Sequence, residues 1–242
     1  MVKTDHYDQF AQFYDNGTST DNVEKVKLLE EIIQRLNPEA KSLLEIACGT
    51  GNVLKPLSSR YEVAGLDLSP KMLDVAKTKL PNVPFYEGDM TKFELDKKFD
   101  IILCIFDSIN HLVEFDQWEA TFDSVKAHLN DSGVFIVDIN TIYKMERFAA
   151  FRPFYSIVEG NYQLINIEKQ RDGLYSWGID VFAPAGDKNT YKLSQTSIPV
   201  SAYPHGQVEQ ALKARFNLVE ASTPDGKPID DATDRIYFSC KL

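Results

Sequence analysis

The sequence predicts a doubly wound α/β fold built on a mostly parallel, seven-stranded sheet. Two observations predict this class. From residue 43 to about residue 142, short apolar runs alternate with amphipathic stretches. Strands that are apolar throughout are typical of a parallel sheet whose faces are both covered by helices. Strands are expected at residues 43–47, 61–66, 83–86, 100–105, 133–138, 216–221 and 235–241.

Helical patterns separate these strands. Ser69 and Pro70 begin one helix, because Ser is a favoured N-cap residue and Pro suits the first helical position. Further helices are expected at residues 115–129 and at about 207–214. Residues 5–37 have the pattern of two more helices, which precede the first strand.

Residues 151–202 differ from residues 43–142 in composition and in pattern. They are rich in Tyr, Ile, Val and Thr, and turn signals stand at Gly160, Gly173 and Gly186. This pattern predicts an antiparallel meander. We therefore expect three parts, namely an N-terminal helical cap at 1–40, a core at 41–150 and 204–242, and an inserted antiparallel β layer at 151–203.

The composition of the 242-residue chain favours a soluble protein with a small-molecule ligand. No apolar run approaches the ~20 residues that cross a bilayer, and the first residues carry no apolar signal-peptide core, so a cytoplasmic location is expected. A net charge of −10, from 26 basic and 36 acidic residues, disfavours a nucleic-acid partner. Cys48, Cys104 and Cys240 are widely spaced, so we expect buried reduced thiols rather than disulfides or a zinc site.

The strongest motif is a glycine turn between a strand and a helix, at residues 43–52 (LLEIACGTGN). Glycines let the backbone approach a ligand closely, and a helix N-terminus offers free N–H groups. Asp67 ends the second strand 18 residues after Gly49, where a carboxylate can bind a ribose. Asp89 follows the third strand, at a position suited to an adenine amino group. These polar groups lie at the carboxyl ends of successive strands, where open α/β sheets bind ligands.

At these motifs the chain resembles the class I S-adenosylmethionine-dependent methyltransferases, whose core is Rossmann-like. The resemblance rests on residues 45–51 (EIACGTG), 65–73 (GLDLSPKML) and 87–90 (EGDM), and it covers about residues 42–141. It implies S-adenosyl-L-methionine as the cofactor.

The resemblance also implies what each matching residue does. The loop of Gly49 and Gly51 would hold the methionine portion of the cofactor, Asp67 the ribose and Asp89 the adenine amino group. Ala47 stands where many members have the first glycine, and we expect little loss from that change. The expected cofactor-binding residues are Tyr14, Glu45, Ala47, Gly49, Gly51, Asp67, Leu68, Met72, Asp89, Met90 and Phe106.

Other interpretations of the same residues remain open. An NAD-binding fingerprint needs a third glycine, and the two possible registers have Asn52 or Leu54 there, which disfavours a dehydrogenase. A non-enzymatic adenosylmethionine-binding protein is a remote alternative. Met72 could belong to the helix core, and Asp67 and Asp89 could be solvated carboxylates at strand ends.

The loop after the fourth strand, residues 104–112 (CIFDSINHL), would face the transferred methyl group in such a fold. It lacks the Asn-Pro-Pro-Tyr type of motif found in base and glutamine amide methylases. It is similar to the loop of small-molecule N-methyltransferases, especially the glycine type and the aminosugar N,N-dimethyltransferases. In the aminosugar enzymes, a Ser is followed by a His that lies beside the acceptor amine. That match falls on Ser108 and His111. His111 could also be a loop histidine without chemistry.

Three further residues are candidates on the acceptor side. Residues 7–15 (YDQFAQFYD) resemble the first helix of the same branch, which closes over the cofactor. Tyr7 and Tyr14 are therefore candidate catalytic residues beside His111, although Tyr14 could simply pack on the core. Arg235 is a weaker candidate, with a surface ion pair as its alternative.

The sequence thus predicts methyl transfer to a small molecule, most readily to an amine nitrogen, by direct displacement. Such a reaction depends on positioning and desolvation, and a neutral histidine can accept the proton that an amine must lose. No metal is expected. The main alternative is O-methylation of a small carboxylate or hydroxyl, and tRNA base methylation is disfavoured by charge. The layer at 151–203 would be an acceptor-side lid that carries specificity. The oligomeric state is left open.

Overall fold

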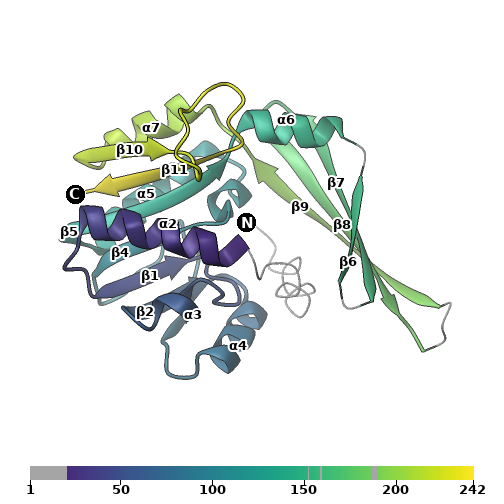
Figure 1. Cartoon of the computed structure of the whole chain (residues 1–242), viewed down its shortest axis with the longest axis horizontal. Helices are drawn as coiled ribbons and strands as arrows, with labels where there is room; N and C mark the ends of the chain where they lie inside the picture. Colours follow the sequence, from purple (N-terminus) through teal and green to yellow (C-terminus); the bar gives the residue numbers. More distant parts are fainter. Residues whose placement is uncertain (1–20, 152, 159, 187–189) are drawn as a thin grey trace.

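The computed structural model describes residues 21–151, 153–158, 160–186 and 190–242. This part of the chain contains a seven-stranded sheet and a separate four-stranded sheet (Figure 1). The predicted fold class is therefore confirmed.

The seven-stranded sheet forms the core. Its strands, in the order in which they lie side by side, are β10 (Leu218–Ser222), β11 (Arg235–Lys241), β5 (Leu129–Asn140), β4 (Phe99–Cys104), β1 (Ser42–Ile46), β2 (Glu62–Asp67) and β3 (Phe85–Glu87). Strand β11 is antiparallel to both of its neighbours, and the other pairs are parallel. The chain moves outward from β1 to β3 and then returns to β4 on the other side of β1. A change of direction of this kind places a ligand crevice at the carboxyl ends of β1 and β4.

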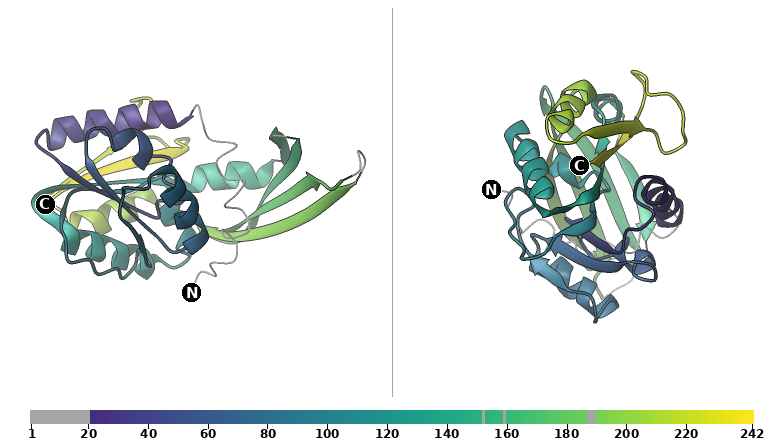
Figure 2. Two further views of the ribbon diagram at one scale, coloured as in Figure 1. Left: turned by 90° about the horizontal axis from the view of Figure 1, so that it is seen from below. Right: turned by 90° about the vertical axis from the view of Figure 1, so that its left-hand side faces the viewer.

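Helices cover both faces of this sheet (Figure 2). They are α2 (Asp21–Leu36), α3 (Leu54–Leu57), α4 (Pro70–Lys79), α5 (Phe115–His128) and α7 (His205–Lys213). On one face, Leu29 of α2 and Leu73 of α4 join a buried apolar cluster with the strands. On the other face, Trp118 of α5 and Val208 of α7 join a second cluster. The apolar character of the strands on both sides follows from this two-sided burial.

The start of α4 agrees with its sequence signals. Pro70 is its first residue, and the Ser69 hydroxyl accepts a hydrogen bond from the backbone N–H of Met72 at 3.2 Å. Helix α6 (Ile142–Ala150), in contrast, was not predicted from the sequence. Its N-cap is Thr141, whose hydroxyl accepts from the backbone N–H of Lys144.

The inserted segment forms the second sheet, as predicted. Its strands are β6 (Phe154–Val158), β7 (Asn161–Arg171), β8 (Leu174–Pro184) and β9 (Tyr191–Ser201), and each pairs with the next in antiparallel fashion. Gly160, Gly173 and Gly186 have positive φ angles at or near the turns. Met145 of α6 packs on the sheet against Ile167 and Tyr175. Figure 1 shows this sheet beyond the end of the core to which the arrowhead of β1 points.

Two smaller predictions can be compared with the structure. Cys48, Cys104 and Cys240 are buried and free, as expected. In the part of the chain that the structure describes, no helix has the length and apolar character needed to cross a membrane. The division of the chain into a cap, a core and a lid remains a prediction.

Candidate active site

The turn after β1 has an unusual backbone. Ala47, Gly49 and Gly51 have φ angles of 54°, 52° and 74°, so three residues of five lie in the left-handed region. The backbone N–H of Cys48 donates to the carbonyl of Leu66 at 3.0 Å, which fastens the turn to β2. Ala47 adopts a conformation that glycine reaches with less strain. Ala47 is therefore a strained residue in this turn.

Asp67 connects this turn to the end of β2. One of its carboxylate oxygens, Oδ2, accepts the backbone N–H of Gly49 at 2.7 Å, and Oδ1 accepts the N–H of Ser69 at 2.8 Å. Each carboxylate oxygen has two lone-pair sites, so a carboxylate can accept several hydrogen bonds at once. A Cβ atom added to Gly49 would meet no atom of the described residues within 4 Å, so these residues leave open space next to the turn.

A cavity joins the turn after β1 to the loop after β4. It is lined by Glu45, Ala47, Cys48, Gly49, Thr50, Asn52, Val53, Ile105, Phe106 and Ser108. Glu45 is buried, and its Oε2 atom has no hydrogen-bond partner among the described residues. Burial, reinforced by the charge of Asp67, raises the pKa of Glu45 well above its ordinary value. A buried carboxyl oxygen with unused hydrogen-bonding capacity fits a ligand that brings its own donor.

The remaining expected cofactor residues lie outside the lining of this cavity. Leu68 is half-buried at the end of β2, Met72 is buried in α4, and Met90 packs against the apolar core. Asp89 follows β3, and its Oδ1 accepts the backbone N–H and the hydroxyl of Thr91 at 2.9 and 2.8 Å. Gly51 faces α4, since a Cβ atom there would lie 3.5 Å from the Cβ atom of Ala76. Their roles toward a cofactor remain predictions, and Tyr7 and Tyr14 lie outside the described residues.

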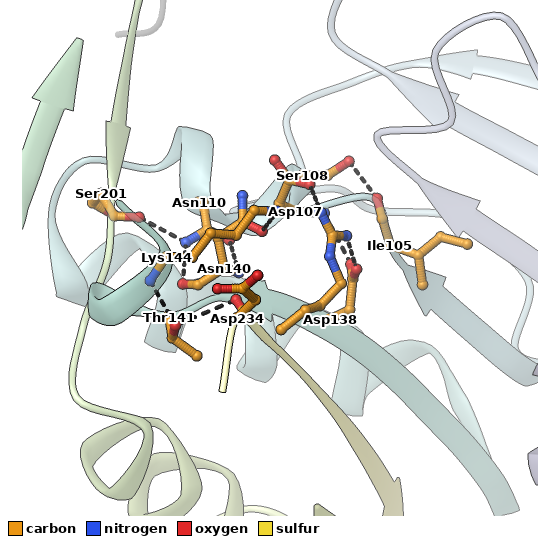
Figure 3. A network of polar contacts seen from close by, with 11 residues as sticks. Ile105, Asp107, Ser108, Asn110, Asp138, Asn140, Thr141, Lys144, Ser201 and Asp234 are labelled. Atoms are coloured by element: carbon orange, nitrogen blue, oxygen red, sulfur yellow. Dashed lines mark hydrogen bonds and ion pairs between the residues drawn. The ribbon is translucent and has the colours of Figure 1, made fainter. Parts of the chain in front are cut away.

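The loop after β4 contains a second left-handed turn. Phe106 and Asp107 have φ angles of 62° and 53°, and the short 3₁₀-helix η2 (Ser108–His111) follows. The Ser108 hydroxyl donates to the carbonyl of Ile105 at 2.8 Å (Figure 3). His111 is half-buried at the end of η2. Burial lowers the pKa of His111 more than the nearby carboxylate of Asp107 raises it, so the neutral imidazole is favoured.

A buried polar network holds η2 in place (Figure 3). The side-chain amide of Asn110 donates to the carbonyl of Ser201 at 2.7 Å, and its oxygen accepts the backbone N–H of Asn140 at 3.0 Å. The hydroxyl of Ser201 donates to the carbonyl of Leu112 at 2.7 Å. The loop is thereby attached both to β5 and to the end of β9, where the chain leaves the second sheet.

Arg235 lies where β11 begins, and it forms ion pairs with Asp107 and Asp138. Its side chain is 15% exposed and that of Asp138 is fully buried, so these ion pairs are interior rather than superficial. Burial opposes the ionisation of Asp107, but Arg235, Lys144 and His111 outweigh it and lower its pKa. For Asp138, burial prevails over the effect of Arg235 and raises the pKa.

Sequence reasoning singled out Arg235 and His111 but missed Asp107, Asp138 and Asn110. One signal could have found the two carboxylates. Asp107 follows β4 and Asp138 lies near the end of β5, and the carboxyl ends of neighbouring parallel strands meet at one edge of a sheet. Among the residues described here, no group of three or more His, Cys, Asp or Glu side chains could hold a metal ion.

Comparison with known proteins agrees with this geometry. A family model described as a methyltransferase domain matches residues 43–133. An uncharacterized methyltransferase of Alkaliphilus oremlandii is 30% identical over 151 residues, which are 59% of this chain and 68% of that protein. The dTDP-3-amino-3,4,6-trideoxy-alpha-D-glucopyranose N,N-dimethyltransferase of Streptomyces venezuelae is 34% identical over 139 residues. That match covers 57% of this chain and only 58% of the Streptomyces protein.

A solved structure extends the likeness to the whole fold. An S-adenosylmethionine-dependent methyltransferase of Clostridium acetobutylicum aligns over 98% of both chains, with a TM-score of 0.86 and 27% identity. The sheet order and the cavity at the carboxyl ends of β1 and β4 define a cofactor-binding α/β protein. This chain belongs to the class I S-adenosylmethionine-dependent methyltransferases, which confirms the resemblance drawn from its motifs.

Proposed function

We propose that this protein transfers the methyl group of S-adenosyl-L-methionine to an amine nitrogen of a small molecule. The observation that carries the proposal is the cavity shared by the two loops. Its walls include Glu45 and Gly49 from the turn after β1, and Phe106 and Ser108 from the loop after β4. His111 ends the 3₁₀-helix that begins at Ser108.

Several groups in the first loop fit the cofactor. The Oε2 atom of Glu45, which has no partner in the described part of the chain, can accept a hydrogen bond from the ammonium group of the methionine portion. The space that the described residues leave beside Gly49 has room for that portion of the cofactor. Asp67, held by two backbone N–H groups, can accept hydrogen bonds from the ribose hydroxyls. When bound, the cofactor supplies an electrophilic methyl group on a sulfonium.

His111 would act as the general base that accepts a proton from the acceptor amine. An ammonium ion has no lone pair, so an amine must lose its extra proton before it attacks. A neutral imidazole can accept that proton, and the lowered pKa of His111 keeps the imidazole neutral near pH 7. Lining up the amine nitrogen with the methyl carbon accounts for much of the remaining acceleration.

An aminosugar is the acceptor class that we favour. The name of the Streptomyces relative specifies an aminosugar nucleotide as its substrate. The match covers only 58% of that relative's length, so we propose the same acceptor class for this chain rather than assign it. The net charge of −10 favours a small molecule over a nucleic acid, and a cytoplasmic setting suits such an enzyme.

The proposal can be tested by incubating the protein with S-adenosylmethionine and a set of aminosugars, simple amines, hydroxy compounds and carboxylates. We expect mass spectrometry to find the added methyl group on nitrogen, and only in reactions that contain an amine. Transfer to a hydroxyl or carboxylate, with none to any amine, would contradict the proposed acceptor chemistry while leaving the family unchanged.

A further inference from the structure

The turn at Phe106 and Asp107 has a backbone conformation that these residue types rarely adopt. Both residues have positive φ angles, and neither is a glycine. Left-handed backbone is a genuine outlier for a bulky residue such as Phe, and it persists only where the surroundings enforce it. Phe106 lines the shared cavity, and its ring lies 4.1 Å from the ammonium of Lys25. The conformation of this turn therefore shapes the cavity wall.

The interactions that enforce the turn come from two distant strands. The backbone N–H of Asp107 donates to Oδ1 of Asp138, near the end of β5, at 2.9 Å. The guanidinium of Arg235, at the start of β11, bonds to the carboxylates of both Asp107 and Asp138. An arginine with two carboxylate partners fixes their relative positions, because its donors form a rigid planar fork.

The same turn determines where η2 begins. Asp107 is the N-cap of η2, and its carbonyl accepts the backbone N–H of Asn110 at 2.9 Å. His111 stands at the other end of this single turn. A shift of Asp107 would therefore displace Phe106 on one side and His111 on the other.

We propose that Arg235 is a positioning residue, which holds the Phe106–Asp107 turn in its left-handed form and so sets both the cavity wall and the direction of His111. This role deepens the proposed function and rests on it for the part that concerns His111. Both ion pairs of Arg235 are directed to protein carboxylates, so its contribution is to fix the loop rather than to touch the reacting atoms.

Removal of Arg235 should make the conformation of the Phe106–Asp107 turn depend on pH. Among the described residues, the charged and titratable groups around the two carboxylates are Lys144 from α6, His111 from η2, Cys104 at the end of β4, and Asp234 and Tyr237 near Arg235. Without Arg235, Asp107 and Asp138 are like charges in a buried site, so one of them would retain a proton. That proton lets one carboxyl hydrogen-bond to the other. As the pH rises and the proton is lost, repulsion should open the turn.

The experiment compares three variants with the wild type. Two are the single substitutions Arg235→Met and Arg235→Lys, and the third combines Arg235→Met and Asp107→Asn in one protein. Adenosylhomocysteine affinity and kcat are measured from about pH 6 to about pH 9, a range that spans the titration of such a pair. We expect Arg235→Met to lose about 10²-fold in kcat, the size of loss that a small misplacement causes. Its affinity should fall further as the pH rises. The double variant lacks the like-charge repulsion, so it should lose this pH dependence.

Two results would overturn the proposal. One is an Arg235→Met protein with wild-type kcat and affinity at every pH, and the other is a double variant with the same pH dependence as the single one. Arg235→Lys retains a cation, so its kcat and its affinity for adenosylhomocysteine should lie between those of the wild type and of Arg235→Met. If Arg235→Met does not fold, Arg235→Lys replaces it in the comparison. Crystal structures of the Met or Lys variant at low and high pH test the turn directly, whatever the acceptor is. A turn that stays left-handed at both pH values would contradict the role of Arg235 even if methyl transfer to amines is confirmed.

Discussion

The backbone N–H of Gly49 donates a 2.7 Å hydrogen bond to the carboxylate of Asp67, which ties the turn after β1 to the end of β2. Asp67 thus shapes the turn, and its carboxylate is also the group that we expect to bind the ribose. The hydrogen bond from the backbone N–H of Cys48 to the carbonyl of Leu66 also connects the turn after β1 to β2.

Replacing Asp67 with Ala should weaken the binding of S-adenosylmethionine. The expected loss is about 1.5–3 kcal/mol for each charge-assisted hydrogen bond that is removed. Titration calorimetry measures it, with circular dichroism to verify folding. The matched control is Asp74→Ala, since Asp74 is an exposed carboxylate on α4 and should not affect affinity. An unchanged dissociation constant in a folded Asp67→Ala protein would remove Asp67 from the site.

Replacing Ala47 with Gly should stabilise the protein or leave its stability nearly unchanged. The left-handed backbone of an alanine costs about 1–2 kcal/mol, whereas the extra freedom of an unfolded glycine costs about 0.5–1 kcal/mol. The net gain should therefore be at most about 1.5 kcal/mol in the free energy of unfolding. Urea denaturation compares this variant with Ala64→Gly, in the middle of β2, which should be clearly less stable than the wild type. Equal destabilisation by both substitutions would contradict the strain assigned to Ala47.

Replacing His111 with Gln should lower kcat by about 10²–10⁴-fold and leave the affinity for adenosylhomocysteine nearly intact. In the wild type, burial lowers the pKa of His111, so the base is already neutral at pH 7. Accordingly, kcat should be level near pH 7 and should fall as the pH drops through this lowered pKa. The control is His205→Gln, because His205 is exposed at the start of α7. A His111→Gln enzyme with the wild-type kcat and pH profile would show that His111 takes no part in proton transfer.

Replacing Asn110 with Ala should destabilise the fold. The backbone N–H of Asn140 and the carbonyl of Ser201 would lose their side-chain partner in a buried position. Each buried group left without a partner costs about 1–3 kcal/mol. Chemical denaturation measures the loss against Asn217→Ala, in which an exposed side chain is removed. A loss no larger than that of the control would mean that the network around η2 adds little to stability.

Much of the core could be predicted because its signals are local. The glycine turn, the Ser69–Pro70 helix start and the continuous apolar strands each require only neighbouring residues to be recognised. The second sheet was predictable for the same reason, from alternating residues and glycine turns. These features depend on backbone preferences that the nearby residues set.

The acceptor side was harder to predict because its parts are distant in the sequence. Arg235 meets Asp107 across 128 residues, and only the antiparallel pairing of β11 with β5 brings them together. No glycine marks the left-handed turn at Phe106, since its conformation depends on tertiary contacts rather than on residue type. Helix α6 is short, and its apolar residue Met145 packs on strands that follow it in the sequence, so the residues near α6 alone do not indicate its buried side.

The central claim, that the loops after β1 and β4 form an S-adenosylmethionine site, is tested most directly by titration calorimetry of the wild-type protein. The ligands are S-adenosylmethionine, adenosylhomocysteine and NAD. We predict saturable binding of the first two, with one equivalent per chain at most, and no binding of NAD. Binding of NAD without any binding of S-adenosylmethionine or adenosylhomocysteine would contradict the claim.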